Sequence, residues 1–171
     1  MPLIVVDVES DGPCVLKHSM QCFGAIVVEP ALNRTFYGET APIHQDFDAE
    51  AMAVTGITRD KHLLFPHPNI TMPAFRDWVK GLGGGQPVFI SDNLAYDWQW
   101  INAYLLAYAG ENPLGWSGRR IGDLWCGFKN DMRARYKHMR KTRHSHDPRD
   151  DARGNAECLL QMKAEGLNII L

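Results

Sequence analysis

The chain has 171 residues, 45% of them hydrophobic, which is enough for one domain around one packed core over residues 1–171. Its formal net charge of −2 excludes the uniformly basic surface of a protein that binds duplex nucleic acid without regard to sequence, so any nucleic-acid site must be local. The four cysteines form no CxxC pair, which excludes a zinc ribbon and a dense disulfide framework and favours a reducing, cytoplasmic compartment.

The beginning of the chain lacks the pattern of a signal peptide, because Asp7 interrupts its first apolar run and no basic residue precedes that run. No stretch of about 18 apolar residues follows anywhere in the sequence. We therefore expect a soluble protein that does not enter a membrane.

Three strands are expected first along the chain. Residues 3–8 form a nearly continuous aliphatic run, which is typical of a buried central strand. Residues 21–29 and 34–40 follow, and the turn at 30–33 is short enough to join them as an antiparallel hairpin. Helices are then predicted around residues 49–54 and, by apolar spacing, at 72–82.

The second half of the chain indicates an α/β layer. A short apolar strand at 87–91 leads into a long helix at about 96–109, and a further helix is expected at 121–129. The basic stretch onward to Arg143 is too irregular to assign. The last helix has clear ends, because Asp147 can cap it, Pro148 suits its first turn and Gly166 can end it.

Two acids interrupt the most hydrophobic strand. Asp7 and Glu9 are two residues apart, so both side chains leave the same face of the sheet. Two carboxylates about 4 Å apart repel each other by roughly 4 kcal/mol at an effective dielectric of 20. A cation between them would offset this cost, although Glu9 could also simply open the following turn in contact with water.

Two further acids lie where elements begin. Asp97 follows the strand at 87–91 by a few residues, and ligand groups commonly occupy such strand ends, although Asp97 or Asp92 could instead cap the helix. Asp151 lies in the first turn of the last helix, on the stripe that continues through Asn155 and Leu159 toward the core. An acid on that side of a helix needs a partner.

Together these elements resemble the DEDDh branch of the DnaQ-like (RNase T) exonuclease superfamily. The motifs that carry the resemblance are D-x-E on the first strand, N-x-x-[FY]-D at a middle helix and H-x-x-x-x-D near the end. They stand here as Asp7 and Glu9, Asn93 with Tyr96 and Asp97, and His146 with Asp151. Residues 54–58, Val-Thr-Gly-Ile-Thr, resemble a Gly-Ile-Thr segment of that family. The resemblance covers nearly the whole chain, whose size is similar to that of oligoribonuclease and RNase T.

The resemblance implies a ribonuclease H-like fold with a mixed β-sheet flanked by helices, and a two-metal hydrolytic site. Asp7 would bridge two ions, Glu9 and Asp151 would complete one shell, and Asp97 would serve the second, largely through water. Because all ligands are oxygen atoms, Mg²⁺ or Mn²⁺ is expected. His146 would deprotonate the attacking water, while His144 has no such role.

The implied reaction is 3′→5′ removal of nucleoside 5′-monophosphates from single-stranded RNA or DNA with a free 3′ end, and size favours RNA slightly. A DNA-directed repair or proofreading exonuclease and a catalytically silent binding module are the alternatives. By resemblance, Ser10, Gly12 and Asn93 would contact the substrate. Asp92 stands where many relatives have a histidine, so contacts there could differ.

Nine of the 18 basic residues lie between Arg119 and Arg143. Arg140, Lys141 and Arg143 of this stretch are candidate strand contacts, and a solvated charged loop is the equal alternative. Trp98 and Trp100 point about 200° apart on a helix, so they are not expected to enter one core. Either a homodimer partner or a loop would cover the second tryptophan.

Overall fold

The computed structural model describes residues 1–171, arranged around a five-stranded sheet in the order β3-β2-β1-β4-β5. β1 pairs antiparallel with β2, and β2 with β3, whereas β1, β4 and β5 run parallel. The mixed sheet that the sequence predicts is therefore present. The strands are β1 (Leu3–Ser10), β2 (Met20–Val27), β3 (Thr35–Glu39), β4 (Val88–Ser91) and β5 (Gly118–Arg120).

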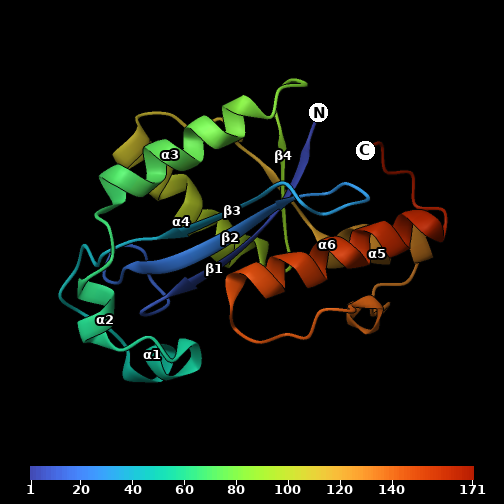
Figure 1. Ribbon diagram of the computed structural model, residues 1–171. Coiled ribbons are helices and arrows are strands. Elements are labelled where there is room, and N and C mark those ends of the chain that lie inside the picture. The colour runs from blue at the N-terminus through green and yellow to red at the C-terminus, as the bar shows by residue number, and fades with distance from the viewer.

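Helices cover both faces of this sheet, with α3 on one face and α6 on the other (Figure 1). The helices are α1 (Ala49–Thr55), α2 (Arg59–Leu63), α3 (Pro68–Gly81), α4 (Leu94–Tyr104), the π-turn η1 (Leu105–Ala109), α5 (Ile121–Lys129), the 3₁₀ turn η2 (Lys137–Met139) and α6 (Pro148–Ala164). None of them combines the length and the apolar character needed to cross a membrane.

The alternation of side chains along β1 divides the core into two layers. Ile4, Val6 and Val8 pack on one face with α3 and α4, whereas Val5 packs on the other face with α5 and α6. Asp7 and Glu9 continue the series of Val5, so they face α6. The period of two in the strand thus directs both acids toward the helix that carries Asp151.

A glycine in β2 lets α6 approach the sheet closely. Gly24 pairs with Asp7 in the β1–β2 ladder, and a Cβ atom at Gly24 would lie 2.3 Å from the carbonyl oxygen of Pro148. No larger residue could occupy this position without moving the helix. Gly24 therefore allows the first turn of α6 to rest directly over the acidic end of β1.

Several elements differ from the expected ones. α3 begins at Pro68, with the ring of His67 accepting from the amide of Asn69, so the helix is one turn longer than predicted. The expected helix at 96–109 begins at Leu94 and loosens into η1 after Tyr104.

The arrangement of the two tryptophans on α4 contradicts the expectation that they cannot share a core. Trp100 is fully buried, and Trp98 is half-buried against the same apolar cluster, with its ring 5.0 Å from that of Phe89. The cluster extends to Phe89 of β4, against which Trp98 packs, so it receives both rings. A homodimer therefore stays a prediction that the tryptophans do not test.

Candidate active site

Three carboxylates meet where β1 ends under α6. Asp7 and Glu9 lie on β1 and Asp151 in the first turn of α6, and their ligand oxygens all lie within 4.8 Å of one another. Asp151 is only 1% exposed. Three acidic oxygens this close, with little water around them, form a site that fits a divalent cation with oxygen ligands.

Asp97 completes the acidic cluster from the other face of the sheet. It lies in the first turn of α4, and its Oδ1 accepts a hydrogen bond of 3.1 Å from the amide of Val8, the residue between Asp7 and Glu9. Asp97 is thereby fixed to β1 and does not cap α4. Asp92 does not cap it either, because the N-cap residue is Asn93, whose side chain makes no capping hydrogen bond.

The electrostatics of this cluster favour the protonated acids in the absence of a cation. Burial, followed by repulsion from Asp151 and Asp97, raises the pKa of Glu9 to about 8. Burial also raises the pKa of Asp97 to about 7, against the hydrogen bond from the amide of Val8. For Asp7, burial and the charges of Asp97 and Glu9 raise the pKa well above its usual value. A bound cation would reverse this preference.

One protein cation already reaches the cluster. An Nη2 of Arg140 lies 2.7 Å from Oδ1 of Asp151, and this side chain is only 10% exposed. Gly154 makes the space for it, because a Cβ there would lie 2.5 Å from Nε of Arg140. Arg140, a candidate strand contact, therefore pairs with Asp151 in this structure, and its contact with a strand stays a prediction. The side chains of Lys141 and Arg143 are exposed and remain predicted strand contacts.

The loop before α6 holds Asp151 and presents two histidines. The amides of Ser145 and His146 donate to the two oxygens of Asp151 at 3.3 and 3.1 Å, and Nδ1 of His144 lies 2.7 Å from Oδ2. The Nδ1 atom of His146 faces Glu9 at 3.8 Å, and its side chain is 44% exposed. His146 has a φ of 59°, an unusual value for a non-glycine residue and common at functional sites.

The residues after Glu9 form a tight corner. The hydroxyl of Ser10 donates to the carbonyl of Gly12 at 2.6 Å and also bonds the hydroxyl of Tyr96. Ser10 is buried, so its backbone, as the resemblance implies, is better placed than its side chain to meet a substrate. Asn93 is exposed at the start of α4 with no side-chain bond. The sequence placed Tyr96 in a motif but did not predict its contact with Ser10.

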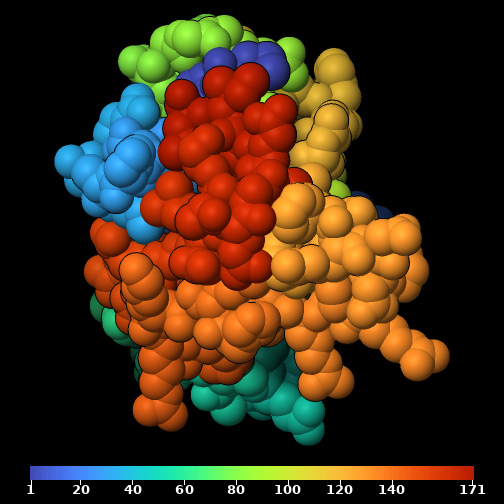
Figure 2. All heavy atoms as spheres, turned by 90° about the vertical axis from the view of Figure 1, so that its right-hand side faces the viewer, coloured from blue at the N-terminus to red at the C-terminus, as the bar shows by residue number.

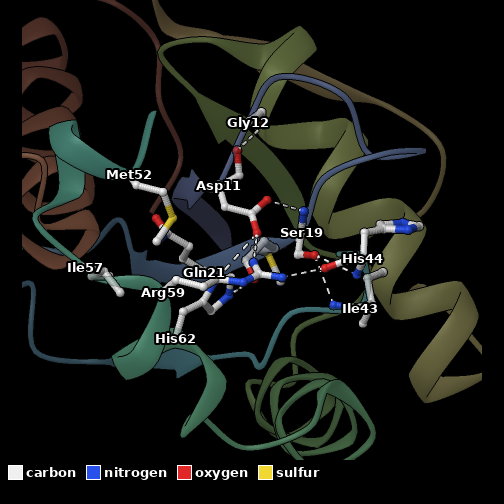
Figure 3. Close-up of polar contacts among 12 residues, drawn as sticks. Asp11, Gly12, Ser19, Gln21, Ile43, His44, Met52, Ile57, Arg59 and His62 are labelled. Carbon is white, nitrogen blue, oxygen red and sulfur yellow. Dashed lines mark hydrogen bonds and ion pairs between the residues drawn. The ribbon is translucent and has the colours of Figure 1, made fainter. Parts of the chain in front are cut away.

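A buried ion pair fixes this corner to the segment between β3 and α3. The carboxylate of Asp11 is completely buried and lies 2.7 Å from Nη1 of Arg59, and it also accepts from the amide of Ser19 (Figure 3). The same guanidinium donates to the carbonyl of His44 at 2.6 Å. His62, whose pKa burial lowers although Asp11 acts to raise it, fills the remaining space. Nothing in the spacing of these residues predicts this cluster.

Asp92 has a structural partner at the end of β4. Its side chain accepts from the hydroxyl of Tyr136 and lies 2.7 Å from Nζ of Lys137. The acid that departs from the family pattern therefore anchors the basic segment before α6.

Comparisons with known proteins agree with this geometry. No family model matches the chain. The 3′-5′ DNA exonuclease Cap18 of Escherichia coli is 35% identical over 128 residues, which are 72% of this chain and 67% of that protein.

Solved structures show a similar fold. The nuclease domain of 3′hExo, a DEDDh family member bound to rAMP, has a TM-score of 0.78 at 15% identity, over 99% of this chain and 94% of that one. The cell-death related nuclease CRN-4 has a TM-score of 0.75 at 16% identity, over 96% and 64%. The E. coli ExoI–ssDNA complex has 0.70 at 15%, over 96% and 41%. The expected ribonuclease H-like fold is confirmed.

Proposed function

Because this chain belongs to the DEDDh 3′-5′ exonucleases of the DnaQ-like superfamily, we propose that it shortens single-stranded nucleic acid from a free 3′ end and releases nucleoside 5′-monophosphates by a two-metal mechanism. The observation that carries this proposal is the triad of Asp7, Glu9 and Asp151, whose ligand oxygens all lie within 4.8 Å of one another.

The four acids would hold two divalent ions, Mg²⁺ or Mn²⁺. Asp7, Glu9 and Asp151 offer oxygen atoms from one side, and Asp97 reaches the same end of β1 from the other. Arg140 alone among the cationic side chains of Lys and Arg pairs with one of these acids, so most of their charge is left uncompensated. Bound ions would stabilise the attacking and leaving oxygens of an in-line displacement.

A side chain of the protein would accept the proton of the attacking water. His146 stands at the exposed side of the cluster facing Glu9, where a neutral imidazole can accept a proton from the attacking water. His144 would instead hold Asp151 in place through its 2.7 Å contact. Ser10 and Gly12 would align the terminal nucleotide along the corner that follows Glu9.

The sugar preference has two candidates. The size of the chain favours RNA slightly, but Cap18, at 35% identity, is described as a DNA exonuclease. We therefore propose single-stranded DNA as the better substrate, with RNA as the competing candidate and a repair or proofreading role as one use of the activity. Cytoplasmic localisation also remains a prediction.

The test uses matched 5′-labelled DNA and RNA oligomers of one sequence, incubated with Mn²⁺, with Mg²⁺ or with EDTA. We expect a ladder that shortens from the 3′ end, release of 5′-monophosphates, and no cleavage in EDTA. Asp7→Asn, nearly isosteric, should lower the rate at least about 10³-fold, since it removes several kcal/mol of charge stabilisation.

Two results would contradict the proposal. Internal cuts would contradict cleavage from the 3′ end, and a near-normal rate for Asp7→Asn would contradict the metal assignment. A strand that is bound but stays intact with either metal would identify the chain as a silent binding module.

A further inference from the structure

A basic pocket lies beside the acidic cluster, outside the residues assigned above to the chemistry. Its volume is about 750 Å³, within the range of cavities that hold small ligands. Asp92 at the end of β4 and Arg120 at the end of β5 line one part of it. The rest of the lining includes Met132, Arg133 and Arg135, which precede η2, and Lys137, the first residue of η2. Figure 2 shows that part of the chain, in orange, projecting beside the C-terminal helix.

The sheet places this pocket next to the acids. β1, β4 and β5 are parallel neighbours, so their carboxyl ends lie at one edge. Neighbouring strands are about 4.8 Å apart, which puts the end of β5 on the order of 10 Å from that of β1. Asn93, which lines the pocket, also begins α4, the helix that carries Asp97. A strand leaving the acids could therefore enter the pocket within a few nucleotides.

The charge of the pocket is opposite to that of the cluster. Four cationic side chains line it against the single acid Asp92. Although burial acts to raise the pKa of Asp92, hydrogen bonds from Lys137 and Tyr136 hold it below its usual value, so this acid is ionised and already paired. Arg120 shares its charge with Asp123. Arg133 and Arg135 are exposed and make no ion pair, so both are free to bind phosphate.

The walls of the pocket are held in place by bonds to its neighbours. The buried ring of Tyr136 bonds Asp92, and Nε1 of Trp125 on α5 donates to the carbonyl of Arg135 at 3.2 Å. Nε of Arg120 donates to the backbone of Asp92 at 3.2 Å. Met132 is 88% exposed, which leaves an apolar, adaptable side chain for a base to rest on.

We propose that this pocket binds the sugar-phosphate backbone of the substrate strand on the 5′ side of the bond that is cleaved. This inference rests on the proposed function and adds a second subsite to it. The subsite gives affinity without sequence preference, because its contacts are charge on phosphate. Its occupancy depends on strand length, since a dinucleotide at the acids is too short to reach it.

The test compares short and long substrates in Arg133→Ala/Arg135→Ala. Binding of a labelled dodecamer, measured in an Asp7→Asn background, should weaken about tenfold, and kcat/KM for the dodecamer should fall similarly. Hydrolysis of a dinucleotide should change less than about twofold, because the acids are untouched. The slope of log affinity against log salt should decrease by about 1.4, since each lost phosphate contact on a single strand contributes about 0.7.

Two control variants separate charge at this place from charge in general. Arg34→Ala/Lys80→Ala removes the same formal charge from two residues that do not line the pocket, and should leave binding of the dodecamer unaffected. Arg133→Lys/Arg135→Lys should retain most of the affinity, because a point charge suffices for phosphate.

An equal loss on dinucleotide and dodecamer, or an unchanged salt slope, would overturn the subsite. If the proposed function itself were wrong, the wild-type chain would instead cleave neither substrate, so the two failures can be told apart.

Discussion

His146 and His144 lie side by side above the acids, and their rings are 4.3 Å apart. His146→Ala should lose about 10²- to 10⁴-fold in kcat, the usual contribution of a general base, but keep Mn²⁺ and strand binding. His144→Ala should be much milder, because the amides of Ser145 and His146 still hold Asp151. Single-turnover rates and calorimetric Mn²⁺ affinities for both variants check this.

One pattern of results would contradict these roles for the two histidines. If His144→Ala is as damaging as His146→Ala, or if His146→Ala abolishes metal binding, then the two rings belong to the metal shell and the proton acceptor must be sought elsewhere. The spatial group of His144, His146 and Asp151 makes this outcome chemically sensible.

Arg140 acts as a built-in counter-charge for Asp151. Arg140→Ala should destabilise the metal-free protein by about 1–3 kcal/mol, since Asp151 loses its guanidinium partner. Asp151 keeps its contacts with the ring of His144 and with the amides of Ser145 and His146. It should also tighten Mn²⁺ binding, because one positive charge fewer opposes the ion. Thermal unfolding in EDTA and calorimetric titration with Mn²⁺ measure the two effects.

Gly154→Ala is the matched variant for this prediction. The added Cβ would lie 2.5 Å from Nε of Arg140 and would displace the guanidinium without changing any charge. Mn²⁺ affinity should therefore rise, while Arg140→Lys should resemble the wild type. Weaker Mn²⁺ binding by Arg140→Ala would show instead that the guanidinium orients Asp151 for the ion.

Among single residues, the sequence predicts the site residues that belong to a short motif with a fixed spacing. D-x-E on a strand and a histidine five residues before Asp151 are such spacings, and the structure brings these residues together. The inward turn of Arg140 depends on Gly154, 14 positions away, and the pairing of Asp11 with Arg59 spans 48 positions. Neither pairing leaves a periodic pattern in the sequence.

Among the elements, α2 helps to hold the loop after β1 through the pair of Arg59 with the buried Asp11. Arg59→Ala should destabilise the protein by on the order of 3 kcal/mol, because it leaves the buried Asp11 without its cation. It should also raise KM with little change in kcat, since the corner at Ser10 and Gly12 loosens while Asp7 remains in the β1–β2 ladder. Unfolding curves and steady-state kinetics on one oligomer test both parts.

Arg59→Lys is the control, because it keeps the charge but cannot reach both Asp11 and the carbonyl of His44 as a fork. An intermediate KM is expected for it. A loss of kcat at unchanged KM in Arg59→Ala would show that the corner does not meet the substrate.

Elements with an apolar pattern were predictable, whereas the short polar elements α2, β5 and η2 were not. α5 was predicted with its observed bounds, and α6 with its cap at Asp147. β5 has only three residues, two of them arginines, and is a strand only because it pairs with β4. α3 was predicted too short because Pro73 interrupts the pattern, although the helix tolerates it in its second turn.

At the scale of the whole molecule, the fold brings mutually repelling carboxylates together where the two layers of the core meet. Three buried or half-buried acids whose pKa values are raised keep their protons in the folded chain at a pH where the unfolded chain has lost them. Folding therefore takes up protons over that range, and the free energy of unfolding falls as pH rises through it. The cost arises from topology, since β1, α4 and α6 each bring a carboxylate to one edge.

The metal-free protein should accordingly lose stability between about pH 4.5 and pH 8. Glu9 contributes stability below its unfolded pKa of 4.5 that is lost as pH rises through its folded pKa of about 8, and Asp97 does the same from 3.8 to about 7. Mn²⁺ binds the deprotonated acids, so the stabilisation that it provides should grow over the same window.

Thermal unfolding from pH 4.5 to 8.5, with EDTA and with saturating Mn²⁺, measures this difference directly. The Tm in EDTA should fall with pH while the Tm with Mn²⁺ stays level or rises, so the two curves diverge toward alkaline pH.

Asp7→Asn should flatten the EDTA curve and raise its alkaline end, because one of the mutually repelling charges is absent. It should also shrink the gap between the curves, since Mn²⁺ then has fewer charges to neutralise. If the EDTA curve is flat in the wild type, or if Asp7→Asn leaves its slope unchanged, the acids are not destabilised by burial and by one another. An unchanged slope in Asp7→Asn, beside a wild-type curve that still falls with pH, would assign the low-pH preference of the metal-free chain to groups outside the acidic cluster.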